Sequence, residues 1–225
     1  KGEENTNAER KIDEYKNQIE QQQLDLLLKN ANEVVPKLNT EEITFFGNPI
    51  NTLTIEAAEV LLNNNGFPSA TASGNPLDVI MEGGDSRSLH RRRSQLFDMN
   101  ISVYQDYDAD YVTSIFYTVS FSRDERIPTD IGICNIFTED TMSEVLTKLG
   151  FPNADEIVNA LEKNENSIQL NSTTESGLKY QFWGSELQLY FTEDENVDII
   201  TFEFNAENGL VLEECHIFKN SIENN

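Results

Sequence analysis

The sequence predicts an α+β protein in which two helix-then-sheet modules follow one another, after a long N-terminal helix. Three observations lead to this fold class. Short landmark motifs recur 81 to 84 residues apart. Helical and strand periodicities alternate in the same order in both halves of the chain. The first forty residues are polar and have apolar side chains at helical spacing.

The 225 residues are enough for one large domain or two small ones. We expect a polar spacer and long helix over residues 1–40, a first module over 41–137 and a second over 138–225. A module of about 80 residues buries only a modest core by itself, so we expect the two modules to share an interface.

The chain is strongly acidic. Lys and Arg number 16 and Asp and Glu number 40, which gives a net charge of −24. Such a charge repels phosphate backbones and argues against nucleic acid as a partner, while it favours basic or divalent counterparts. A surface that is merely solvated would carry the same charge.

The N-terminal segment is expected to be helical from about residue 8 to residue 38. Its apolar residues Ile12, Tyr15, Ile19, Leu26 and Leu27 recur at helical spacing. Three glutamines, 21–23, interrupt this stripe, so we expect residues 24–35 to dock on the body and the first half to project. Pro36 and Asn39-Thr40 end the helix. Fewer than three clean heptads argue against insisting on a coiled coil.

The first seven residues are too polar to pack and are interpreted as a spacer. Such a spacer follows the lipid-anchored cysteine of bacterial surface lipoproteins, and the chain lacks both a start Met and a signal peptide. No stretch approaches the roughly 20 apolar residues that span a bilayer. We therefore expect an extracytoplasmic protein that meets the membrane only through an N-terminal lipid anchor.

Each module is expected to begin with a helix that ends at Gly-Phe-Pro, at residues 66–68 and 150–152. Glycine tolerates the left-handed cap, and the proline that follows cannot continue the helix. Thr54 with Glu56, and Thr138 with Glu139, suit the two N-termini. A second short helix follows each triplet, over residues 76–81 and 154–162.

The period then changes to two, as in antiparallel strands with one buried face. Copy two alternates Leu187, Leu189 and Phe191, then Ile200, Phe202 and Phe204; copy one alternates Ile101 and Val103, then Ile115, Tyr117, Val119 and Phe121. A last strand is expected in both copies because Cys134-Asn135-Ile136-Phe137 matches Cys215-His216-Ile217-Phe218. The two cysteines form either a disulfide, if these strands lie side by side, or two buried free thiols.

The order of the elements and the Glu-Val-Leu…Gly-Phe-Pro segments resemble the family of the secreted beta-lactamase inhibitor protein (BLIP) and its relatives among small bacterial surface lipoproteins. The resemblance covers about residues 51–218. It implies two helix-loop-helix modules, each with a four-stranded antiparallel sheet, that combine into one curved sheet with a protein-binding open side and no enzymatic activity. The chain departs from family members with a disulfide inside each module, because it has one Cys per copy, and its long N-terminal helix is additional.

The residues themselves indicate no catalytic, cofactor or metal site. There are two histidines, His90 and His216, and His216 is interpreted as a half-buried strand residue without the further ligands that zinc needs. Neither a Gly-x-Ser-x-Gly nucleophile motif nor a glycine-rich phosphate loop is present. Asp106, Asp108 and Asp110 have the first spacings of a calcium loop but not its later glycine and glutamate, so an acidic turn is the simpler interpretation.

Two surfaces are candidates for binding. If Tyr180 and Phe182 face the helices, then Trp183 faces the other side of the sheet with Lys179 and Gln181, and the same alternation adds Tyr190, Tyr104 and Phe116. The second candidate is the basic run that contains Arg87, His90, Arg91, Arg92 and Arg93, just before the expected first strand. It is either a solvated loop or a docking point for an acidic segment.

We expect a non-catalytic binding protein that grips another protein or a cell-envelope component with the open sheet face. The alternative is a structural protein that self-associates through its N-terminal helix. Exposed aromatic residues on the sheet face favour the first function, and a covered face favours the second.

Overall fold

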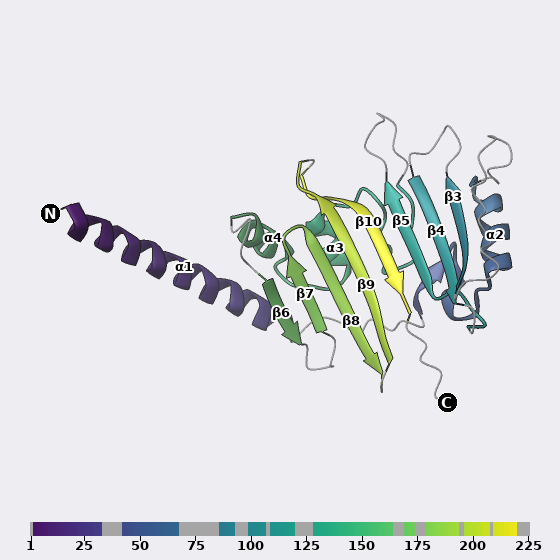
Figure 1. The fold of residues 1–225 in the computed structure, drawn as a ribbon, viewed down its shortest axis with the longest axis horizontal. Helices are drawn as coiled ribbons and strands as arrows, with labels where there is room; N and C mark the ends of the chain where they lie inside the picture. Colours follow the sequence, from purple (N-terminus) through teal and green to yellow (C-terminus); the bar gives the residue numbers. More distant parts are fainter. Residues whose placement is uncertain are drawn as a thin grey trace.

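A computed structural model describes residues 2–32, 42–67, 86–92, 99–106, 109–119, 128–163, 169–173, 179–193, 196–207 and 209–219. Over these residues the protein is α+β, with the expected long N-terminal helix and antiparallel sheets (Figure 1). The expected second helix of copy one (76–81), Phe121 and the end of the N-terminal helix near Pro36 lie outside the described residues.

The elements follow one another along the chain in this order: α1 (Gly2–Asn32), β1 (Thr44–Phe45), β2 (Asn48–Pro49), a short 3-10 helix (Ile50–Thr52), α2 (Ile55–Asn64), β3 (Ser86–Arg92), β4 (Met99–Asp106), β5 (Ser114–Val119), α3 (Met142–Lys148), α4 (Ala154–Lys163), β6 (Gln169–Thr173), β7 (Lys179–Trp183), β8 (Glu186–Glu193), β9 (Asn196–Asn205) and β10 (Val211–Phe218).

Eight strands form one antiparallel sheet in the order β3-β4-β5-β10-β9-β8-β7-β6. The last strand of the chain, β10, therefore lies between β5 and β9, and Cys215 pairs with Tyr117 on one side and Phe202 on the other. The sheet is continuous across the expected module boundary at residue 137. β1 and β2 form a separate small hairpin.

One face of this sheet is buried, because alternate residues of every described central strand are apolar. Val103, Tyr117, Phe202 and Ile217 are at most 1% exposed. Helices α2, α3 and α4 and the β1–β2 hairpin pack on this face in a single core (Figure 1). A β-bulge between Leu212 and Glu214 lets both Leu212 and Cys215 point into the core.

The glycine-terminated helices are confirmed at both places. After α2, the N–H of Phe67 donates to the carbonyl of Leu62 (2.9 Å) and Gly66 has φ +86°. After α3, the N–H of Phe151 donates to the carbonyl of Leu146 (2.9 Å) and Gly150 has φ +89°. Both ends have the hydrogen bond of a Schellman cap, and the phenylalanine of each packs into the core.

The expected N-terminus of α2 is confirmed and that of α3 is wrong. Thr54 caps α2 by accepting a hydrogen bond from the N–H of Ala57. The N-cap of α3 (Met142–Lys148) is Thr141, three residues later than expected, and it forms a capping box with Glu144. Hydrogen bonds from Thr141 hold the pKa of the Glu144 carboxyl below its usual value. Thr138 is buried instead, and its hydroxyl accepts from the N–H of Thr129 (2.9 Å).

The expected last strand of copy one, at 134–137, is also wrong, because these residues belong to a tight turn. The N–H of Ile131 donates to the carbonyl of Ile136 (3.0 Å), and Cys134 and Asn135 have φ +47° and +56°. The turn brings Ile131, Ile133 and Ile136 into the core. Cys134 is exposed and Cys215 is buried, and both are free. Of the two alternatives, the disulfide is therefore absent, and the expectation of two buried thiols is correct for Cys215 and wrong for Cys134.

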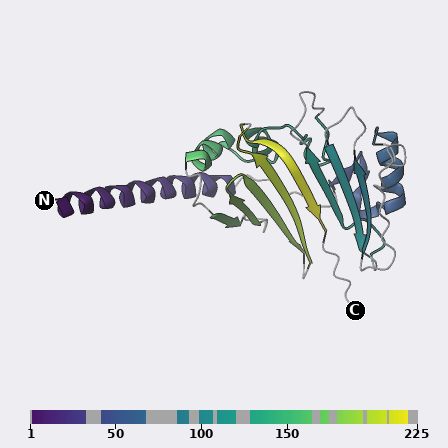
Figure 2. The same ribbon diagram turned by 45° about the horizontal axis from the view of Figure 1, so that its top comes forward.

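Helix α1 starts at Gly2, earlier than the expected start near residue 8, so residues 2–7 form part of the helix. The helix contacts α4 and the edge strand β6, and its N-terminal half extends away from the body in both ribbon views (Figures 1 and 2). Leu26 belongs to the second half of the helix, which was expected to dock on the body, but its side chain is 59% exposed. No helix in the described part of the chain combines the length and the apolar character that crossing a membrane requires.

Candidate binding surface

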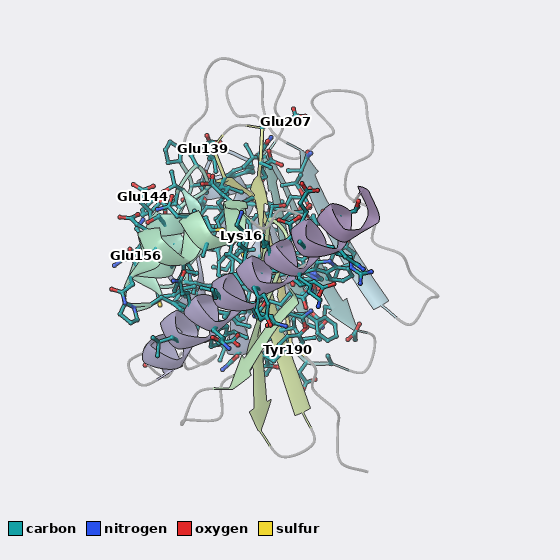
Figure 3. The ribbon with its side chains drawn as sticks, turned by 90° about the vertical axis from the view of Figure 1, so that its left-hand side faces the viewer. Lys16, Glu139, Glu144, Glu156, Tyr190 and Glu207 are labelled. Carbon is teal, nitrogen blue, oxygen red and sulfur yellow. The ribbon has the colours of Figure 1, made fainter. Side chains whose placement is uncertain are left out.

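The second face of the large sheet carries the side chains that alternate with the core. We call it the open face. Its described residues are Ser102, Tyr104, Ser114, Phe116, Thr118, Gln181, Trp183, Glu186, Gln188, Tyr190, Thr201, Glu203, Glu214, His216 and Phe218, all exposed or half-buried. The alternation expected for Trp183, Tyr190, Tyr104 and Phe116 is thus confirmed, because all four lie on this face. In Figure 3, Tyr190 lies on the side of the molecule away from Glu144 of α3 and Glu156 of α4.

Trp183 is the most exposed aromatic residue of this face, at 67%. It is the last residue of β7 and pairs with Glu186 across the two-residue loop Gly184-Ser185. Gly184 has φ +60°, which favours glycine at the first loop position and makes the hairpin tight. The indole therefore stands at the tight end of a hairpin, and the described residues leave most of it open to solvent.

Next to Trp183, three side chains of β8 form a chain of hydrogen bonds along the open face. The Tyr190 hydroxyl donates to Oε1 of Gln188, and Nε2 of Gln188 donates to Oε1 of Glu186. Residues two apart on a strand share a face, so these contacts order the surface along the strand. Partial burial, and then the Glu186 carboxylate, raise the pKa of the Tyr190 hydroxyl, which stays protonated at neutral pH.

A row of three carboxylates crosses the open face from β8 to β10. Glu186 lies directly opposite Glu203, and Glu203 lies directly opposite Glu214. Like charges in directly opposed strand positions repel one another. Burial, then Glu203 and Glu213, raise the pKa of the Glu214 carboxyl. The sheet therefore holds an unfavourable concentration of negative charge beside Trp183.

We expect Glu214→Gln to stabilise the folded protein by about 0.5–1 kcal/mol at pH 7, because it removes one partner of a repulsive cross-strand pair. The folded protein holds the Glu214 proton more tightly than the unfolded chain does. In the folded protein the repulsion between Glu214 and Glu203 is therefore absent below the ordinary pKa of a carboxyl group. It develops as the pH rises through the raised pKa of Glu214. Urea denaturation at pH 4 and pH 7 measures this, and a gain as large at pH 4 as at pH 7 would contradict it.

A half-buried aromatic cluster occupies the next row of the open face, over β5 and β10. Nε2 of His216 lies 2.6 Å from Oγ of Ser114, and its ring centre is 5.1 Å from that of Phe116 and 6.3 Å from that of Phe218. Burial lowers the pKa of His216, so its ring is neutral at pH 7. His216 is the half-buried strand residue that the sequence predicts.

The basic run is placed differently from the sequence expectation. Arg87, His90, Arg91 and Arg92 belong to β3 itself, where His90 pairs with Ser102 and Arg92 with Asn100. Their position is the edge of the sheet, where charged residues commonly discourage pairing with another strand. Arg93 lies outside the described residues. The structure separates this run from Trp183 by most of the width of the sheet.

The described residues bring together no group of three His, Cys, Asp or Glu side chains that could hold a metal ion. Of the acidic positions considered for calcium, Asp106 ends β4 and Asp108 is outside the described residues. His216 has a hydroxyl neighbour in Ser114, but the ring contacts of His216 are with phenylalanines.

The row of three carboxylates was not predicted from the sequence, although the sequence places two of its members on the open face. Glu186 and Glu203 both alternate with core residues, so both could be assigned to the open face. Their direct opposition depends on the register of β8 with β9, and that of Glu214 depends on the bulge in β10. No family model, curated protein or solved structure was found to match this chain at a significant level.

Proposed function

We propose that this protein is a non-catalytic binding protein that uses the open face to grip another protein or a cell-envelope component. The observation that carries the proposal is the exposure of Trp183, the one tryptophan of the chain, at a tight hairpin of the large sheet. Exposed aromatic residues on a preorganised surface supply much of the binding energy of protein interfaces. A face covered by α1 would instead have favoured a purely structural role.

The charge of the open face supports a partner that presents Lys or Arg side chains. The carboxylate row begins at Glu186, directly opposite Trp183. A cationic side chain placed there would relieve the repulsion among the carboxylates and could stack on the indole ring. Binding by such a partner is expected to weaken as the salt concentration rises.

The resemblance to the BLIP-like family extends the proposal to the organisation of the chain and to its place in the cell. The chain would comprise two repeated modules, and the protein would be extracytoplasmic and held at the bacterial cell surface by an N-terminal lipid. The two Schellman-capped helices, α2 and α3, support a repeat because they end with the same hydrogen bonds and the same buried phenylalanine.

Site-specific photo-crosslinking in intact cells tests this function. A photoreactive residue in place of Trp183 or Tyr190 is expected to trap a defined partner. The same residue in place of Tyr111, which is 45% exposed and outside the large sheet, is the matched control. Equal trapping at all three positions, or none at the two open-face positions, would rule out the open face as the binding surface.

The double substitution of Trp183 and Tyr190 by alanine is expected to reduce capture of the trapped partner more than tenfold, because each aromatic anchor contributes about 1–2 kcal/mol or more. Both residues point away from the core, so the melting temperature should change little. Tyr111→Ala serves as the control. Undiminished capture by a folded double variant would contradict the proposal.

A further inference from the structure

Helix α1 exposes a row of large apolar side chains. Ile12, Tyr15, Ile19 and Leu26 are 54%, 65%, 54% and 59% exposed. They follow one another at intervals of three, four and seven residues, which is the spacing of the a and d positions of a coiled coil. Ala8, four residues before Ile12, continues this row at a d position. We call Ala8, Ile12, Tyr15 and Ile19 the α1 seam.

The seam lies on the half of α1 that projects from the body (Figures 1 and 2). Lone helices of this kind are marginal in water, and most of their stability in proteins comes from packing an apolar stripe. The ion pair between Arg10 and Glu14, at 3.6 Å, is exposed and on a different side of the helix from the seam. It supports the helix without covering the apolar row.

The charges beside the seam favour pairing with α1 of a second copy, and they favour one relative direction of the two helices. In a parallel pair, Lys11 of one copy would lie next to Lys16 of the other, in two repulsive contacts. An antiparallel pair that sets Ile12 opposite Tyr15 and Ala8 opposite Ile19 removes this conflict. That register places Glu9 of each copy next to Lys16 of the other and Lys11 next to Gln18. Lys16 is marked on the projecting helix in Figure 3.

We infer that α1 pairs antiparallel with α1 of a second copy of this chain, in the register that sets Ile12 against Tyr15. Every apolar residue of the seam then meets an apolar residue, and the two Glu9–Lys16 contacts are attractive. The sheets stand at opposite ends of the pair, because the body follows the C-terminal end of each helix. This inference does not depend on the proposed function, although two open faces in one particle would bind a repetitive partner more tightly than one.

Sedimentation equilibrium of the full chain, over protein concentrations from micromolar to millimolar, measures the pairing. Wild type is expected to dimerise weakly, and Ile12→Asp to remain monomeric. Lys16→Glu is expected to weaken the dimer about tenfold, which corresponds to about 1.4 kcal/mol, because it sets Glu9 against a second carboxylate in two places. The double variant Glu9→Lys with Lys16→Glu should restore wild-type affinity, since both attractive contacts return with reversed polarity.

Asp13→Lys is the control, because it makes a charge change of the same size as Glu9→Lys on the side of the helix away from the seam. It should leave the dimer unchanged. Tighter association of Lys16→Glu would show the parallel pair and overturn the inference, since that change sets Lys11 beside a glutamate. A wild-type chain that stays monomeric at millimolar concentration would overturn it as well.

Discussion

Replacing Gly132 with alanine is expected to destabilise the folded protein by about 3 kcal/mol or more, and so to lower its melting temperature by roughly 6–12 °C. Gly132 is in the turn that follows β5 and has φ +77°. A Cβ atom built there would lie 1.7 Å from the carbonyl oxygen of Thr44. No rotamer relieves this overlap, because the backbone of residue 132 fixes the position of Cβ and the carbonyl oxygen of Thr44 is itself a backbone atom.

The backbones approach so closely because the N–H of Thr44 donates to the carbonyl of Gly132 (3.0 Å). This bond attaches the β1–β2 hairpin, with the buried Phe45, to the turn that carries Ile131 and Ile133. Any shift that accommodates a Cβ atom separates two parts of the core. The cost therefore includes lost packing in addition to the strain of a positive φ.

A variant at Gly47 distinguishes the strain of a positive φ from the loss of packing. Gly47 also has φ +77° and lies in the same hairpin as Thr44, but nothing is within 4 Å of its added Cβ. Gly47→Ala should cost only about 1–2 kcal/mol, the ordinary cost of an alanine at positive φ. Calorimetry of both variants measures the difference. Equal melting temperatures would mean that the Thr44–Gly132 approach contributes nothing.

The local elements of the fold could be predicted from sequence because each is specified by neighbouring residues. Gly66 and Gly150 end their helices by a conformation that other residues avoid, and the following phenylalanine packs back onto the last turn. The face of each strand followed from alternation alone. For that reason the sequence correctly placed Trp183, Tyr190, Tyr104 and Phe116 on one side of the sheet.

Two of the errors, the last strand of copy one and the position of the basic run, concern contacts between distant segments. Residues 134–137 match the sequence of the strand at 215–218, but the place beside β5 belongs to β10, which arrives from the far end of the chain. The sequence carries no signal for this choice, since pairing is decided by competition among strands in space. The basic run was assigned to a loop for a related reason. An edge strand can be rich in arginine, and its position at the edge is known only once the sheet order is known.

The position of β10 between β5 and β9 also sets the reactivities of the two cysteines. They are expected to differ by roughly a thousandfold or more. Cys215 is 1% exposed in β10, at the centre of the sheet, and burial raises its pKa far above the ordinary value for a thiol. A reagent reaches it only when the sheet opens, which is a rare event of nearly global unfolding. Cys134 is exposed in its turn and should react in the native state.

Cys134 should nevertheless react more slowly at pH 8 than free cysteine. Partial burial, and then the nearby Glu42 carboxylate, raise its pKa above the ordinary 9.0, so less of the reactive thiolate is present. Its rate should keep rising with pH beyond 9. Titration with a chromogenic disulfide is expected to release one thiol equivalent per native chain and two in denaturant, and Cys134→Ala should remove the native phase. Two fast equivalents in the native protein would show that β10 is not buried between β5 and β9, and none would place Cys134 in a closed environment instead of an exposed turn.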